Sequence, residues 1–159
     1  MTVPKDSSFT SYGGYGFWAG NVYMQTWLCV LVEQIDGLAA CPAWLLEARD
    51  NWAKQGQIAN PGAMIADLDI YVVDQARREQ LVGLSNGAVE RLRRFGQTIP
   101  IEYLRAIGAE PKGTMFLRPL QTAPFIAYGE KWLVLLRGDP EITSSKNPDR
   151  IMVDPRKMN

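Results

Sequence analysis

Apolar side chains recur at helical spacing through residues 21–56, and this pattern constrains the fold more than any other feature of the chain. Gly37 is a typical helix stop. Pro42 is a typical helix start, because proline lacks the N–H that the first helical turn leaves unpaired. The pattern predicts one helix from Asn21, as N-cap, to Gly37 and a second from Pro42 to about Gly56. Their short connection predicts an antiparallel helical hairpin.

Residues 64–74 fit two patterns. In a helix, Ile70 and Val73 lie on the apolar face together with Leu81, whereas in a strand Ile70 shares one face with Val72. We favour the helix, because aspartates at its start would complement the positive end of the helix dipole. The chain from this segment onward predicts three helices, over residues 67–84, 86–95 and 100–107.

The character of the chain changes after Pro111. Short apolar runs predict three strands, over residues 114–120, 124–128 and 131–137, and Gly129-Glu130 between the last two is a hairpin signal. We therefore expect an α+β fold, with four or five helices in the N-terminal two-thirds packed on a small C-terminal antiparallel sheet of about three strands. The expected domain spans residues 1–138, including an aromatic and glycine-rich segment over 1–20. A polar, proline-rich tail over 139–159 follows, in which residues 151–153 form the only candidate edge strand.

The chain contains no histidine, the commonest general base and metal ligand. Residues 83–87, Gly-Leu-Ser-Asn-Gly, match the G-x-S-x-G motif of serine hydrolases, in which a histidine takes the proton of the serine. We predict instead that Ser85-Asn86-Gly87 ends one helix and caps the next. Cys29 stands in an apolar run and is expected to be buried, while a disulfide between Cys29 and Cys41 stays open. A zinc site is not expected.

Residues 64–69, Met-Ile-Ala-Asp-Leu-Asp, resemble the first motif of haloacid-dehalogenase-like phosphatases. The resemblance covers this segment alone, and it implies that Asp67 and Asp69, on one face of a strand, hold Mg²⁺. Tyr71 departs from the threonine or valine of that motif, and the sequence shows no later aspartate pair to complete the metal site. An acidic helix start explains the two aspartates better, so no metal or cofactor is expected.

Seventeen basic and seventeen acidic residues give a formal net charge of zero, so no overall field attracts nucleic acid or an anionic membrane. The one basic concentration consists of Arg77, Arg78, Arg91, Arg93 and Arg94. On helices these side chains would line a surface for phosphates or for an acidic partner, although a solvated helix face explains them as well. The polar first residues and interrupted apolar runs favour a cytoplasmic protein without a membrane partner.

Aromatic residues and glycines are dense over residues 9–27, where the rings either cover the core or form a rigid recognition surface. Because the sequence shows no convergent catalytic set, we expect a non-catalytic protein-binding module. Its class would be the small bacterial immunity or inhibitor proteins, which neutralise a toxin or enzyme by direct binding. The expected partner-binding residues are Tyr12, Tyr15, Trp18, Asp67, Asp69, Asp74, Arg91 and Arg94. Two alternatives remain: a histidine-free hydrolase or Mg²⁺-dependent phosphatase using Asp67, Asp69 or Ser85, and a nucleic-acid-binding protein using the arginines.

Overall fold

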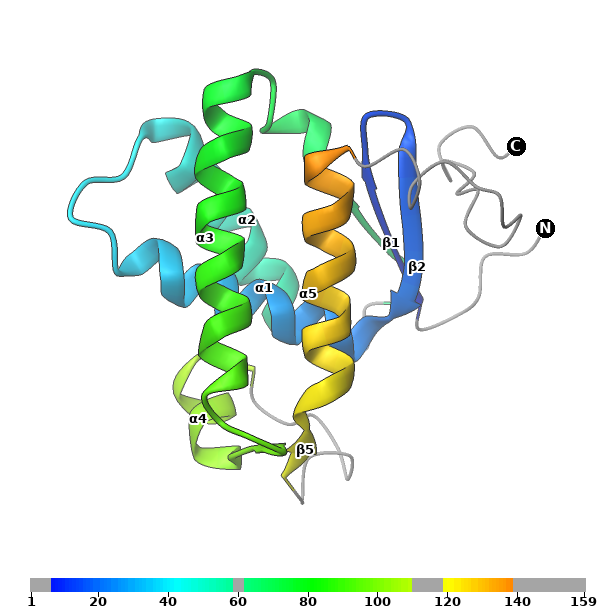
Figure 1. Cartoon of the computed structure of the whole chain (residues 1–159), viewed down its shortest axis with the longest axis vertical. Coiled ribbons are helices and arrows are strands. Elements are labelled where there is room, and N and C mark those ends of the chain that lie inside the picture. The colour runs from blue at the N-terminus through cyan, green and yellow to red at the C-terminus, as the bar shows by residue number, and fades with distance from the viewer. Residues whose placement is uncertain (1–6, 59–61, 110–118, 139–159) are drawn as a thin grey trace.

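The computed structural model describes residues 7–58, 62–109 and 119–138. Within these residues the helices are α1 (Asn21–Asp36), α2 (Ala43–Gln57), α3 (Gln75–Arg93), α4 (Ile101–Ala106) and α5 (Thr122–Arg137). The strands are β1 (Ser7–Tyr12), β2 (Tyr15–Gly20), β3 (Met64–Asp67), β4 (Thr98–Ile99) and β5 (Leu120–Gln121), and a 3-10 helix, η1 (Leu68–Ile70), follows β3. The fold is α+β, but its three-stranded sheet comes from the N-terminal half and the last described element is a helix (Figure 1). The predicted C-terminal sheet is therefore wrong.

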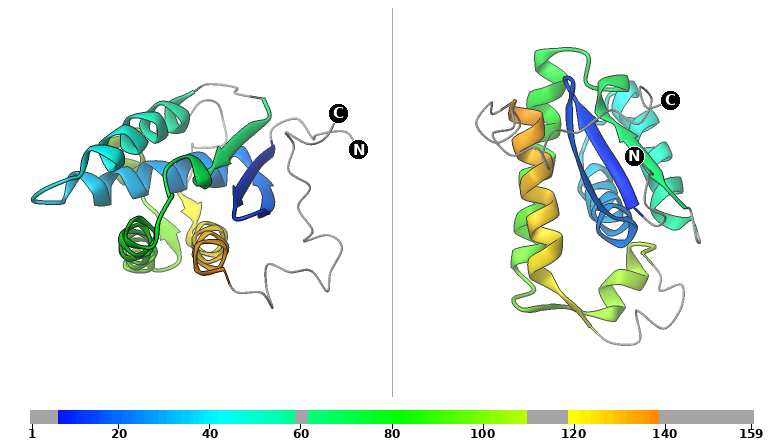
Figure 2. Two further views of the ribbon diagram at one scale, coloured as in Figure 1. Left: turned by 90° about the horizontal axis from the view of Figure 1, so that it is seen from above. Right: turned by 90° about the vertical axis from the view of Figure 1, so that its right-hand side faces the viewer.

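Helix α1 lies at the centre of the molecule, with α2 on one side and α3 and α5 on the other (Figure 2). Residues 27–32, Trp-Leu-Cys-Val-Leu-Val, are buried without a break, as in a helix that is covered all round. The predicted helix and the burial of Cys29 are confirmed. The prediction that Asn21 is the N-cap of this helix is wrong, because Gly20 is the N-cap and Asn21 is the first helical residue. The Asn21 side chain instead accepts a hydrogen bond from Ser8 Oγ at 2.6 Å and donates to the carbonyl of Gly62 at 2.5 Å.

The other helices whose ends are marked by proline and glycine are also confirmed. Helix α2 begins directly after its N-cap Pro42, and α4 begins directly after its N-cap Pro100. Gly108, with a φ of +83°, follows the end of α4. Strands β4 and β5 pair antiparallel at the same end of the molecule as α4 (Figure 1).

Residues 122–137, predicted as two strands and a turn, form the single helix α5. Its buried side chains include Phe125, Tyr128 and Trp132, which recur every three or four positions, and this is the helical period. Gly129 lies inside the helix rather than in a hairpin turn. A Cβ atom added there would lie 2.4 Å from Cζ3 of Trp27, so the glycine is what allows α5 to approach α1.

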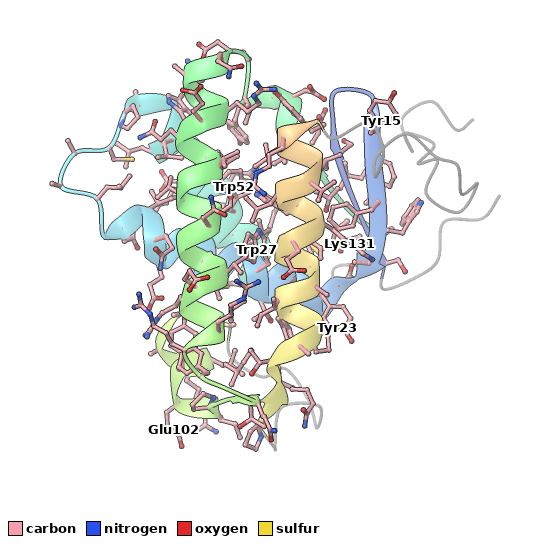
Figure 3. All side chains as sticks on the ribbon, in the orientation of Figure 1. Tyr15, Tyr23, Trp27, Trp52, Glu102 and Lys131 are labelled. Atoms are coloured by element: carbon pink, nitrogen blue, oxygen red, sulfur yellow. The ribbon has the colours of Figure 1, made fainter. Side chains whose placement is uncertain are left out.

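Three indole rings meet where α1, α2 and α5 converge. The ring of Trp132 lies 5.8 Å from that of Trp27 and 5.9 Å from that of Trp52, measured between centroids. All three side chains are buried, and the labelled pair lies in the interior behind α3 and α5 (Figure 3). This aromatic cluster forms the middle of the core.

Residues 7–20 form the hairpin β1–β2. Its turn contains Gly13 and Gly14 at φ +61° and +87°, angles that glycine adopts without a steric cost. Thr10 is fully buried in β1 although it is polar, because its hydroxyl shares a 2.6 Å hydrogen bond with the Tyr128 hydroxyl. Strand β3 pairs parallel with β1, which gives the order β2-β1-β3.

The prediction of two helices over 67–84 and 86–95 is wrong in two respects: the helix does not begin at residue 67, and it does not break at residue 85. The chain runs through β3 and η1 first, and one continuous helix, α3, begins after Asp74. The Asp74 side chain accepts the backbone N–H of Arg77 at 2.8 Å, which is a standard N-cap contact. Ser85 lies inside α3, so the Ser-Asn-Gly sequence does not break the helix. Helices α3 and α5 run antiparallel side by side (Figure 1).

Several expectations fall outside the described residues. These are the strand at 151–153, the tail over 139–159 and most of the strand predicted over 114–120. Leu120 and Gln121 are described, as β5. The boundary of the expected domain at residue 138 stays a prediction.

Candidate protein-binding surface

The turn that follows β3 is built around Leu68. Its side chain is fully buried, and its carbonyl accepts the N–H groups of Tyr71 at 3.1 Å and Val72 at 2.8 Å. The Asp67 side chain caps this 3-10 turn by accepting the N–H of Asp69 at 3.1 Å. Because Leu68 points into the core, the tight turn carries other side chains outward.

Asp69 joins this turn to the tip of the β1–β2 hairpin. Both of its carboxylate oxygens accept the backbone N–H of Gly13, at 3.1 and 3.2 Å. The contact brings Tyr12 beside η1. On the other side, Arg77 donates to the carbonyl of Tyr71 at 3.0 Å and lies over the Trp44 ring at 5.2 Å. The segment between η1 and α3 is therefore held at both ends.

An open hollow of about 540 Å³ lies between the hairpin and the start of α3. We call it the larger hollow, and it is lined by Tyr12, Asp69, Val72, Val73, Asp74, Gln75 and Arg78. Three of the predicted partner-binding residues, Tyr12, Asp69 and Asp74, meet there. Val73 stands at the same place with 64% of its surface exposed, although the sequence had placed it on the buried face of a helix.

A second hollow, of about 160 Å³, lies on the β3 side of η1. We call it the smaller hollow, and it is lined by Asn51, Trp52, Gln55, Ile65, Ala66, Asp67, Ile70 and Tyr71. Ile70 is 64% exposed and Ile65 is 41% exposed. We define the η1 surface as Tyr12, Ile65, Asp69, Ile70, Val73 and Asp74, which combines exposed apolar side chains with two carboxylates.

The remaining predicted partner-binding residues lie elsewhere or serve the fold. Tyr15 is exposed at the tip of the hairpin (Figure 3), and Trp18 packs on Phe9 with 5.0 Å between ring centroids. Asp67 is buried where it caps η1. Arg91 and Arg94 lie at the opposite end of α3 from the η1 surface, about 25 Å along the helix.

Arg91 belongs to a cluster that joins three helices. Its Nε donates to Glu33 Oε1 at 3.2 Å, and its guanidinium lies over the rings of Phe95 and Tyr103 at 5.0 and 4.7 Å. The Tyr103 hydroxyl also donates to Glu33, at 2.7 Å. Burial, and then this hydrogen bond, raise the pKa of Tyr103 above its ordinary value. The cluster attaches α4 to α1 and α3.

Two other arginines of the basic concentration, Arg78 and Arg93, are engaged by neighbouring side chains. Arg93 pairs with Glu90 at 3.1 Å and with Glu130 at 2.8 Å, and Arg78 donates to Gln75. Arg94 is exposed. Because carboxylates stand among these cations, the described part of α3 does not present an uninterrupted basic row of the kind that binds phosphates.

Ser85 has a structural role. It is fully buried, its hydroxyl donates to the carbonyl of Leu81 at 2.6 Å, and it accepts the indole N–H of Trp132 at 2.9 Å. Both functions of the hydroxyl are therefore used inside the core. The G-x-S-x-G match places a core serine in a helix and not a nucleophile on an exposed turn.

The cysteines and the aspartates were the remaining candidates for a disulfide or a metal site. No disulfide joins Cys29 and Cys41. Within residues 7–58, 62–109 and 119–138, no group of three or more cysteine, aspartate or glutamate side chains is placed to hold a metal ion. None of the helices in these ranges is long and apolar enough to cross a membrane.

Comparison with protein-family models, with curated proteins and with solved structures finds no match to this chain. The geometry of the η1 surface is therefore the basis for the function proposed below.

Proposed function

We propose that this chain is a non-catalytic protein-binding module that neutralises a toxin or enzyme by direct contact, and that the η1 surface is where the partner binds. The observation that carries the proposal is the exposure of Ile70 and Val73, each at 64%, in a segment fixed by hydrogen bonds. They are the most exposed of the large apolar side chains among the described residues. If a partner buried the exposed surface of both side chains, the hydrophobic contribution to the free energy of binding would be about 2–4 kcal/mol.

The composition of the surface supports a protein partner. Apolar side chains in the middle with an aromatic and charged groups around them are typical of protein interfaces. Here Tyr12, Asp69 and Asp74 line the larger hollow together with Val73. The carboxylates favour a partner that brings lysine or arginine to the larger hollow, since complementary charge directs encounter and fixes orientation.

The rigidity of the segment also supports binding. Asp69 holds the hairpin tip and Asp74 caps α3, so little conformational entropy is lost when a partner docks. A catalytic role gains no comparable support, because Ser85 is enclosed and Asp67 caps η1.

The proposal is tested by capture from a lysate of the source organism with three immobilised proteins: wild type, Val73→Arg and Leu46→Arg. Leu46 is a matched control because it is also an exposed apolar residue, at 48%, and lines neither hollow. We expect one protein to be retained by wild type and by Leu46→Arg, and to be lost by about tenfold or more on Val73→Arg. Equal recovery of every protein on wild type and Val73→Arg contradicts the proposal.

A further inference from the structure

Strand β3 lies at the edge of the three-stranded sheet. Its partner is β1, in the order β2-β1-β3, and no other described strand pairs with it. The peptide groups on the outer side of such a strand form a row of donors and acceptors that can pair with an added strand.

The smaller hollow runs along this edge. Three successive residues of β3, Ile65, Ala66 and Asp67, line it. Successive side chains of a strand point to opposite faces, so a hollow that reaches all three lies beside the strand rather than over one face. Helix α2 forms the opposite wall, and Figure 2 shows β3 between β1 and α2.

The size and lining of the smaller hollow suit one apolar side chain. A cavity of about 150 Å³ holds a benzene-sized group, and this hollow measures about 160 Å³. Two rings, of Trp52 and Tyr71, line it and meet edge to face with 5.7 Å between centroids. The Tyr71 hydroxyl is already paired, since it accepts from the Asn51 amide at 2.9 Å.

Gln55 supplies an acceptor that has no donor. Its Oε1 atom is buried without a hydrogen-bond partner, while its Nε2 donates to Asn51 Oδ1 at 3.5 Å. Gln55 lines the smaller hollow from α2. Buried acceptors are normally satisfied, so this atom favours a ligand that brings an N–H group.

We propose that an extended segment of the partner protein pairs with the outer edge of β3 at the mouth of the smaller hollow, beside the exposed Ile65. One large apolar side chain of this segment fills the smaller hollow against Trp52 and Tyr71, and an N–H group of the segment donates to Gln55 Oε1. Strand addition of this kind draws affinity from main-chain hydrogen bonds and specificity from a side-chain pocket. The inference rests on the proposed function, because the smaller hollow is one side of the η1 surface.

The probe is a library of linear seven-residue peptides displayed on phage and selected on the full chain. Enriched peptides are then synthesised and titrated against wild type, Gln55→Leu, Gln55→Glu, Ile65→Arg and Leu46→Arg. Gln55→Glu keeps an acceptor at the same atom, and Leu46→Arg is an exposed apolar control outside both hollows. Circular dichroism checks that each variant is folded, and hydrogen exchange follows the amides of residues 64–67.

We expect the enriched peptides to share one large apolar residue and to slow hydrogen exchange in β3. Their affinity falls by about tenfold with Gln55→Leu and with Ile65→Arg, falls less with Gln55→Glu, which keeps the acceptor, and is unchanged with Leu46→Arg. The inference is overturned if the selection enriches no peptide sequence, or if Gln55→Leu and Ile65→Arg bind the peptides as wild type does. It is also overturned if the amides of β3 are protected without peptide because the chain self-associates. Loss of capture by Val73→Arg with unchanged peptide binding on Ile65→Arg would refute this inference alone and leave the proposed function standing.

Discussion

Replacement of Gly129 by alanine tests the packing of α5 against α1 directly. The added Cβ would lie 2.4 and 2.8 Å from two ring atoms of Trp27 and 2.9 Å from Cγ2 of Val89. Both neighbours are buried, so neither can move freely. Overpacking of this kind costs about 1–3 kcal/mol, and three such contacts place the cost at the upper end. Alanine returns about 1 kcal/mol of helix propensity, which leaves a net loss of about 2 kcal/mol.

Gly83→Ala is the matched control, because Gly83 is also inside a helix but a Cβ there would meet nothing within 4 Å. It should gain up to about 1 kcal/mol from propensity alone. In thermal unfolding monitored by circular dichroism, we expect Gly129→Ala to melt about 4–8 °C below wild type and Gly83→Ala about 2–4 °C above it. If Gly129→Ala is as stable as wild type, the close approach of α5 to α1 is refuted.

Three further predictions follow from the core and the turn. Ser85→Ala leaves the indole N–H of Trp132 buried without an acceptor, so urea unfolding should show a loss of about 1–2 kcal/mol; an unchanged midpoint contradicts the assigned role of this serine. Burial raises the pKa of both Tyr103 and Tyr128 above the ordinary value of 10. Below pH 10 both tyrosines therefore keep their protons in the folded and the unfolded chain, and above it the unfolded chain loses them first. The free energy of unfolding should then fall by about 1.4 kcal/mol per pH unit for each tyrosine, and Tyr128→Phe should halve the slope. Asp69→Ala should speed hydrogen exchange at the Gly13 amide while stability changes by less than about 1 kcal/mol, because that contact is exposed; unchanged exchange would show that Asp69 does not hold the hairpin tip.

The helices bounded by proline or glycine could be predicted from the sequence. Pro42, Pro100 and Gly37 mark boundaries that depend on local backbone chemistry, which is visible in the chain itself. Helix α5 was missed because its long apolar run fits a buried strand as well as a buried helix. Gly129 then supplied a false turn signal, since its actual role depends on a tryptophan a hundred residues away.

The N-terminal hairpin was missed for a related reason. Its inward-facing positions include Thr10, whose polar character hides the alternation that predicts a strand. The hydroxyl is acceptable in the core because Tyr128, from α5, satisfies it. A partner so distant in the chain leaves no signal in the local sequence.

The candidate surface was predicted in part. The sequence predicts Tyr12, Asp69 and Asp74 as partner-binding residues without placing them together, and the fold brings all three to the lining of one hollow. Ile70 and Val73 were assigned to a core, because helical spacing through residues 67–84 placed them on one face with Leu81. The 3-10 turn ends that spacing and leaves both side chains exposed. The signal that was available is the alternative strand pattern over residues 64–74.

We propose that the chain neutralises a partner through the η1 surface. The most direct measurement is the partner's own toxic or enzymatic activity, titrated with wild type and with Val73→Arg. We predict that activity is lost at one equivalent of wild type and is retained with the same amount of Val73→Arg. Activity that survives an excess of wild type, or that both proteins abolish equally, contradicts the claim.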